Sequence, residues 1–258
     1  MEPFVIPLAK FQLFLVCAAR VGALMATLPV FGSCTAPVRV RIGLAVFMAL
    51  LVFPVVEGYL PPADFGPGTL AVLVVSETLL GVMVGFTARL VFTAVELGGT
   101  IIGYQMGFAA ANVYDPQNQR QVSLVSQFQN ILAILIFLAL DVHHLFLRAI
   151  VRSYDFLSPG QLDLGGGAVP FLMGLAGQMF SLGVQFSAPI LAVLLLSGLV
   201  LGILARVFPQ LNVFLLSFPL NIGISLLVIG LTLPLVVSLL GREFAALQDR
   251  VLFLFQAL

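Results

Sequence analysis

The sequence has 258 residues, of which 61% are apolar and only 9% carry a charge. A soluble domain carries roughly 25% charged residues, so this composition excludes an ordinary soluble fold and predicts a membrane protein. The 11 basic and 11 acidic residues give zero net charge. Nucleic-acid-binding surfaces are basic, so no nucleic-acid partner is expected.

The apolar stretches predict an all-α, polytopic membrane protein that forms a single domain over residues 1–258. Backbone groups in lipid must be satisfied internally, and runs this continuous favour helices over a barrel. Turn residues, such as the Pro- and Gly-rich segment 61–68, separate the runs. The expected helices cover residues 11–29, 42–56, 69–92, 94–109, 122–155, 164–205, 211–240 and 242–258.

Two of these blocks are free of charge over long distances. No charged side chain occurs from Leu164 to Ala205, or from Val207 to Gly241. A membrane span needs about 20 apolar residues, so each block can hold at least one span. The first block predicts either one very long, bent helix or a tight hairpin.

Four charged residues, Arg20, Glu77, Arg89 and Glu96, interrupt otherwise apolar helices. A charge at the bilayer centre costs about 2.5–3.5 kcal/mol on insertion scales, so such charges are usually paired and functional. They are candidates for contacts with partner subunits or for the lining of a path. The alternative is that they reach the interface from helix ends. For Arg20 and Glu77, burial in protein with a partner is favoured.

A ladder of glycines at every fourth position, Gly99, Gly103 and Gly107, removes side chains from one stripe of a helix. This spacing predicts close packing against another helix. Gly198 and Gly202 form a second, shorter instance. A polar stretch follows the ladder, so it either connects two helices or lines a cavity that reaches water.

No set of residues predicts an enzyme, and no cofactor or metal is expected. Asp141, His143 and His144 resemble a ligand cluster, but no further residue at suitable spacing completes a zinc site. Motifs of the zinc protease, nucleophile-elbow and phosphate-binding-loop types are not present in the sequence.

Four segments, in this order, resemble the FliR family of type III secretion export-gate subunits. They are ARVGALMATLPVF with PVRVRIGLA (19–45), ELGGTIIGYQMGFAAANVYDP (96–116), the helix ending in FLALDVHHLFL (127–147), and PQLNVFLLSFP (209–219). The resemblance covers nearly the whole chain. It implies a helical export gate in the inner membrane of the bacterial flagellar basal body, through which unfolded flagellar subunits pass.

The resemblance also implies partners and a gating element. The expected partners are FliP-like, FliQ-like and FlhB-like subunits, together with the exported chains and membrane lipid. In the family, the loop after the glycine ladder acts as a plug beneath the closed pore. By position, the plug and its closing residues are Gly107, Phe108, Ala109, Ala110, Ala111, Asn112, Val113, Tyr114, Asp115 and Pro116.

Two other functions stay open at the level of sequence. A virulence injectisome gate subunit shares the core motifs of the flagellar one. A secondary transporter for small solutes fits broken helices with Pro189 and Pro219, although the internal repeats and mid-membrane polar cluster typical of transporters are missing from the sequence.

Overall fold

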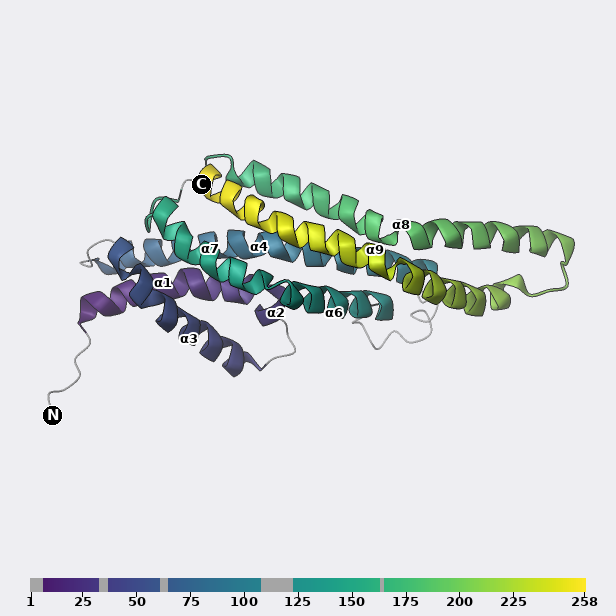
Figure 1. The fold of residues 1–258 in the computed structure, drawn as a ribbon, viewed down its shortest axis with the longest axis horizontal. Coiled ribbons are helices and arrows are strands. Elements are labelled where there is room, and N and C mark those ends of the chain that lie inside the picture. Colours follow the sequence, from purple (N-terminus) through teal and green to yellow (C-terminus); the bar gives the residue numbers. More distant parts are fainter. Residues whose placement is uncertain (1–6, 33–36, 61–64, 108–122, 163–164) are drawn as a thin grey trace. The chain divides into compact units, whose positions relative to one another are not determined.

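The computed structural model describes residues 7–32, 37–60, 65–107, 123–162 and 165–258 (Figure 1). Every regular element in these ranges is helical, which confirms the all-α prediction. The elements are α1 (Leu8–Thr27), α2 (Pro29–Gly32), α3 (Val38–Val56), the 3₁₀ turn η1 (Glu57–Tyr59), α4 (Pro67–Gln105), α6 (Leu124–Ala139), α7 (Val142–Phe156), α8 (Ala168–Val207) and α9 (Val213–Ala257).

Within the described ranges, the helices α1, α3, α4, α8 and α9 are long and apolar enough to cross a membrane. The pair α6 and α7 is bent by 62° and would form a sixth span if it acts as one. The chain is therefore a polytopic α-helical membrane protein, as the charge-free runs predict.

The chain folds into two compact units. Unit 1 holds residues 1–90, 137–175 and 244–258, and unit 2 holds residues 91–136 and 176–243. Both units are assembled from segments that are distant in sequence, and α4, α6, α8 and α9 each supply residues to both. The single domain over residues 1–258 remains a prediction.

The core of unit 1 is built on α1 and on a cluster of aromatic rings. Val16, Val21 and Leu24 lie on one face of α1 and are buried. The Phe137 ring centroid lies 6.4 Å from that of Phe146 and 5.5 Å from that of Phe244. These aromatic contacts fix the end of α6, the start of α7 and the end of α9 against one another.

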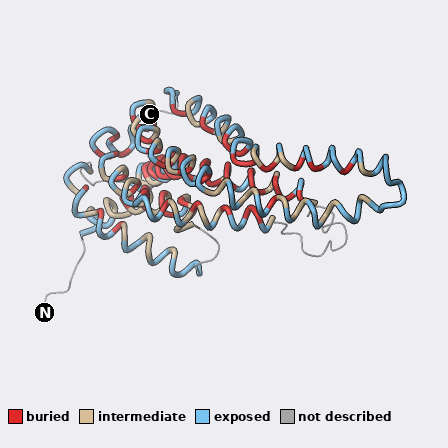
Figure 2. The backbone as a smooth tube through the Cα atoms, turned by 45° about the vertical axis from the view of Figure 1, so that its right-hand side comes forward, coloured by how far each residue is buried: buried red, intermediate tan, exposed pale blue. Residues whose placement is uncertain are grey.

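The core of unit 2 joins α4, α6 and α8. Ile102, Met106, Val125, Ile190 and Leu194 form its buried cluster, and residues of α9 pack against it. Beyond this cluster, most residues of the α8–α9 hairpin are exposed, and they are pale blue in Figure 2. Many of these residues are large and apolar, for example Leu199, Ile203, Phe214 and Leu227, so lipid or other protein must cover them.

The predicted helix end at Phe92 is wrong, since α4 passes through this residue and ends only at Gln105, with 39 residues in all. The segment contains no proline after its first residue, and its buried stripe runs without a gap through Ala88, Val91, Val95 and Ile102. At a rise of 1.5 Å per residue, the helix is about 58 Å long, roughly twice the 30 Å hydrocarbon core.

The predicted division of the last segment at Gly241 is also wrong. Helix α9 extends over 45 residues and contains Pro219 and Pro234 in its interior. A glycine inside a helix costs only about 1 kcal/mol relative to alanine. Buried residues on both sides, including Leu240, Phe244 and Leu247, supply enough packing to outweigh that cost.

The segment predicted as one helix over 122–155 is instead broken between Ala139 and Val142. Asp141 adopts a left-handed backbone conformation with φ 53°, which ends α6 and starts α7 at a 62° angle. Asp tolerates this conformation better than most residues. By contrast, the charge-free block is one long helix from Ala168 to Ala205, all within α8, which contains Pro189.

Candidate functional site

The end of α4, at the start of the predicted plug, is fixed by one glycine. Gly107 has φ +93°, a conformation that residues with a side chain rarely adopt. A Cβ atom at this position would lie 2.7 Å from the Phe218 ring of α9. Two independent constraints therefore require glycine where α4 stops. The plug residues Phe108 to Pro116 lie outside the described residues.

Two glycines of the ladder, Gly99 and Gly103, face the start of α6 and the residue before it. A Cβ added at Gly99 would overlap the Ser126 backbone, and one added at Gly103 would overlap the Ser123 side chain. The ladder thus brings the end of α4 and the start of α6 into contact within unit 2. The sequence predicts such packing, and the structure identifies the second helix as part of the same chain.

Polar side chains of α6 line this contact. The Ser126 hydroxyl donates a hydrogen bond to the Glu96 carbonyl oxygen at 3.0 Å. Ser126 and Gln129 are buried. The Ser123 hydroxyl and the Gln129 side-chain oxygen are also buried, and no partner for them occurs among the described residues. Among the described residues, the hydrogen bond from Ser126 to the Glu96 carbonyl therefore joins α4 and α6 where the glycines let them approach.

A further close approach in unit 2 was not predicted from sequence. A Cβ at Gly98 would lie 2.9 Å from the Gly183 carbonyl oxygen, and Gly183 in turn packs on Leu97. The two glycines let α4 and α8 approach along their backbones. Gly98 and Gly183 lie 85 residues apart, so no local spacing signals the pair.

Gly198 and Gly202 do not pack as the ladder does. A Cβ at either position would meet no heavy atom within 4 Å in the described structure. Nearby, the Ser197 hydroxyl hydrogen-bonds the Asn221 side-chain oxygen at 3.2 Å and so joins α8 to α9. The predicted helix-packing role of these two glycines has no intrachain partner here and remains a proposal for contacts with another subunit.

Arg20 and Glu77 form a buried ion pair in unit 1, with side-chain exposures of 0% and 2%. The Arg20 Nε donates to the Glu77 carboxylate. Its other nitrogens donate to the Ser153 hydroxyl at 2.7 Å and to the Leu157 carbonyl at 3.3 Å. The guanidinium carbon also lies 3.8 Å from the centre of the Tyr154 ring.

Each nitrogen of this guanidinium therefore donates one hydrogen bond inside the chain. A buried charge is tolerated only when a partner and hydrogen bonds compensate its desolvation. Here one arginine on α1 connects α4 with α7 and with the residue after it. Because both side chains are buried, Arg20 and Glu77 cannot touch another subunit directly. They would affect subunit contacts by fixing how the helices of unit 1 pack.

A second glycine pair supports the same region. A Cβ at Gly81 would overlap the Arg20 backbone, and one at Gly85 would overlap the Thr27 side chain. Gly81 and Gly85 have the four-residue spacing of a helix-packing motif. The four-residue spacing is therefore a local signal for this contact, and it was not among the predicted packing motifs.

Arg89 and Glu96 are exposed, in contrast to Arg20 and Glu77. They lie seven residues apart, two turns along α4, and Arg89 belongs to unit 1 while Glu96 belongs to unit 2. Of the four predicted intramembrane charges, these two are the ones that a partner subunit can reach. Their role in subunit contacts remains a proposal.

Asp141, His143 and His144 lie where α6 meets α7. Their potential ligand atoms all lie within 4.8 Å of one another, and the Asp141 carboxylate pairs with His144 Nδ1 at 3.4 Å. These three residues, which lie within four positions of the sequence, supply only part of a coordination shell. Arg148 and Arg152 follow on the same helix and would repel a cation.

Comparison with known proteins finds relatives over most of the chain. A family model described as bacterial export proteins, family 1, matches residues 11–247. The flagellar biosynthetic protein FliR of Bacillus subtilis strain 168 is 35% identical over 238 residues, with 91% of each chain covered.

Two further relatives carry the same name. The flagellar biosynthetic protein FliR of Caulobacter vibrioides is 33% identical over 216 residues, with 83% of this chain and 86% of the relative covered. That of Escherichia coli K12 is 30% identical over 227 residues, with 88% and 86% covered. This chain therefore belongs to the FliR family of bacterial export proteins.

Proposed function

We propose that this chain is a structural and gating subunit of the flagellar protein export gate, through which unfolded flagellar subunits leave the cell. The relatives are flagellar biosynthetic proteins, and the family is one of export proteins. The proposed location is the bacterial inner membrane, at the flagellar basal body. No catalytic step is assigned to the chain, because gating requires only displacement of packed residues.

The observation that carries the gating part is the double anchor around residues 108–122. Gly107 packs on Phe218 before this segment, and Ser123 packs on Gly103 after it. Both ends of the segment are therefore held at the end of the same helix. The residues that flank the proposed plug are thus positioned by packing near the end of α4, and this supports the gating proposal.

The composition of the predicted plug suits this role. Residues 108–113 read FAAANV, which are small or apolar apart from Asn112. Such side chains exclude water and ions from a narrow channel, and dispersion contacts between them are individually weak. A passing polypeptide can therefore displace them without any covalent chemistry.

The proposed partners are FliP-like, FliQ-like and FlhB-like subunits. Helices α8 and α9 contain 40 and 45 residues, or about 60 and 68 Å of helix, well beyond the 30 Å of a hydrocarbon core. Exposed apolar residues continue along this length. Large exposed apolar patches mark interaction surfaces, so part of the hairpin fits against other subunits as well as against lipid.

The gating proposal is tested by deleting residues 107–113 in cells that carry the complete export apparatus. Loss of the plug is expected to depolarise the inner membrane, which a potential-sensitive dye reports. Gly174→Ala is the matched control, because a Cβ at Gly174 meets no atom within 4 Å. Normal membrane potential together with normal export in the deletion strain would contradict the gating role.

The flagellar role is tested separately by motility. A deletion strain is expected to lose swimming and to regain it with the intact gene. The injectisome alternative expects the loss of effector secretion instead, and the names of the relatives favour the flagellar system. Purification of the tagged protein from native membranes tests whether the three proposed partners accompany it.

A further inference from the structure

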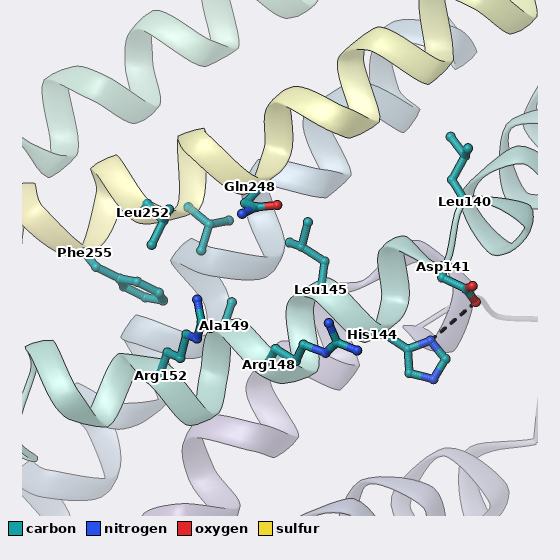
Figure 3. A pocket seen from close by; sticks show the side chains of 11 residues that line it. Leu140, Asp141, His144, Leu145, Arg148, Ala149, Arg152, Gln248, Leu252 and Phe255 are labelled. Atoms are coloured by element: carbon teal, nitrogen blue, oxygen red, sulfur yellow. Dashed lines mark ion pairs between the residues drawn. The ribbon is translucent and has the colours of Figure 1, made fainter.

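A groove of about 590 Å³ lies between α7 and the last turns of α9, within unit 1 (Figure 3). Its basic side chains come from α7, and its apolar wall comes from both helices. The residues that matter to its chemistry are His144, Leu145, Arg148, Arg152, Leu252 and Phe255. Pockets of roughly 300–1,000 Å³ accommodate small ligands, so the groove has the size of a binding site.

The groove exists because α7 is amphipathic. Val142, Phe146 and Ile150 form its buried face and pack into unit 1. His144, Arg148 and Arg152 recur at every fourth residue, so they form a stripe on another face of the helix. This face is exposed at Arg148 and Arg152, and in Figure 3 both guanidinium groups lie along the groove.

The two arginines have no partner among the residues that the structure describes. No ion pair or hydrogen bond joins either guanidinium to another described side chain or carbonyl. Asp141, the acidic residue in the groove lining, pairs with His144 instead. Two positive charges therefore face the groove beside an apolar wall, an arrangement that favours an anion with an apolar part.

The position of α7 in the chain indicates where that anion comes from. Helix α7 follows the apolar helix α6 after a 62° bend, so a strongly apolar segment is succeeded by an amphipathic one with a basic face. Basic amphipathic helices of this kind lie at the membrane–water interface and attract anionic lipids. Leu140 and Phe156, at the two ends of α7, are 51% and 54% exposed and extend the apolar surface around the groove.

We infer that this groove binds an anionic phospholipid, with Arg148 and Arg152 contacting the phosphate and an acyl chain lying along Leu252 and Phe255. Arginine is well suited to this contact because its planar guanidinium matches phosphate oxygens in a two-pronged geometry. An acidic protein segment would satisfy the charges but would leave the apolar wall and its exposed flanks without a matching surface.

The test uses the full-length protein purified in a mild detergent. Native mass spectrometry measures how much phosphatidylglycerol, and how much phosphatidylcholine with the same acyl chains, each protein molecule retains. The test variant is Arg148→Gln/Arg152→Gln. The control variant is Arg39→Gln/Arg206→Gln, which removes the same charge from two exposed arginines outside the groove.

The wild-type protein and the control are expected to retain phosphatidylglycerol in preference to phosphatidylcholine. The test variant should lose about tenfold in phosphatidylglycerol retention, because each basic residue near an anionic headgroup contributes to binding, with no change in phosphatidylcholine. Leu252→Asn, which keeps both arginines, should weaken retention of long-chain lipid and leave binding of soluble glycerol phosphate unchanged. Circular dichroism checks that each variant retains its helix content.

Three results would overturn the inference. Retention of phosphatidylglycerol that survives Arg148→Gln/Arg152→Gln would show that lipid binds elsewhere. Inorganic phosphate that competes as well as phosphatidylglycerol would identify a soluble-anion site. Unchanged lipid retention combined with loss of another export subunit on co-purification would assign the groove to a protein partner.

Discussion

Arg20 and Glu77 lie 57 residues apart in sequence and form a direct ion pair with both side chains buried. The arginine also donates to Ser153 and to the Leu157 carbonyl, so one side chain connects three helical segments of unit 1. Such a pair contributes little net stability when compared with apolar residues, but removing only one partner leaves a buried charge. The pair therefore behaves as a unit.

Glu77→Gln is expected to destabilise the protein by about 3–5 kcal/mol, because the Arg20 charge would remain buried without its counter-ion. Replacement of both residues, as in Arg20→Met/Glu77→Leu, should restore most of that loss. Thermal unfolding of the purified protein in detergent measures the difference. Arg39→Gln, at an exposed position, serves as control; a single Glu77→Gln variant as stable as that control would contradict the coupling.

Gly85→Val is expected to destabilise unit 1 by about 1–3 kcal/mol, the usual cost of overpacking. A Cβ at Gly85 would overlap the Thr27 side chain, so α1 and α4 would have to separate. Gly174→Val adds the same side chain where no atom lies within 4 Å and controls for the loss of glycine from a helix. Equal melting temperatures for the two variants would show that the close approach is unimportant.

Several features could be predicted from sequence because they depend on local composition. The charge-free runs predicted helices that avoid water, and the spacing of Gly99 and Gly103 predicted close packing. The same rules failed where tertiary packing decides the outcome. Helix α4 passes through Phe92 because its buried stripe continues, and Asp141 breaks a helix because its backbone adopts φ 53°.

Pairing between distant residues was the part that sequence could not specify. The sequence predicts that Arg20 and Glu77 are buried and paired. No local pattern indicates that Ser153 and Leu157 accept the other hydrogen bonds of Arg20. The approach of Gly98 to Gly183 is equally non-local. The basic stripe on α7 is visible in the sequence, yet its significance depends on the apolar wall that α9 supplies from about 100 residues further along.

Gly107→Ala is expected to disturb the proposed gate, because Gly107 packs against Phe218 directly before the proposed plug. The added methyl group is disfavoured by φ +93° and would lie 2.7 Å from the Phe218 ring. We expect membrane depolarisation and reduced export, both measured in cells with the complete apparatus. Gly107→Ala/Phe218→Ala should recover part of the effect, since it removes the clash but not the backbone strain. Full recovery would assign the defect to the clash alone.

Gly99→Val is expected to impair the folding stability of the chain, and Gly202→Val is expected to impair its assembly with other subunits. A Cβ at Gly99 would overlap the Ser126 backbone, whereas one at Gly202 would meet no atom within 4 Å. Gly99→Val should therefore lower the melting temperature of the isolated protein, by separating α4 from α6.

Gly202→Val should leave that temperature nearly unchanged and reduce co-purification of the other export-gate subunits, because a small-residue stripe that is open in the single chain is available to a neighbouring helix. Melting in detergent and subunit recovery from native membranes measure the two effects separately. If Gly202→Val left subunit recovery intact, lipid rather than protein would cover this stretch of the α8–α9 hairpin, and the glycines at positions 198 and 202 would have no role in assembly.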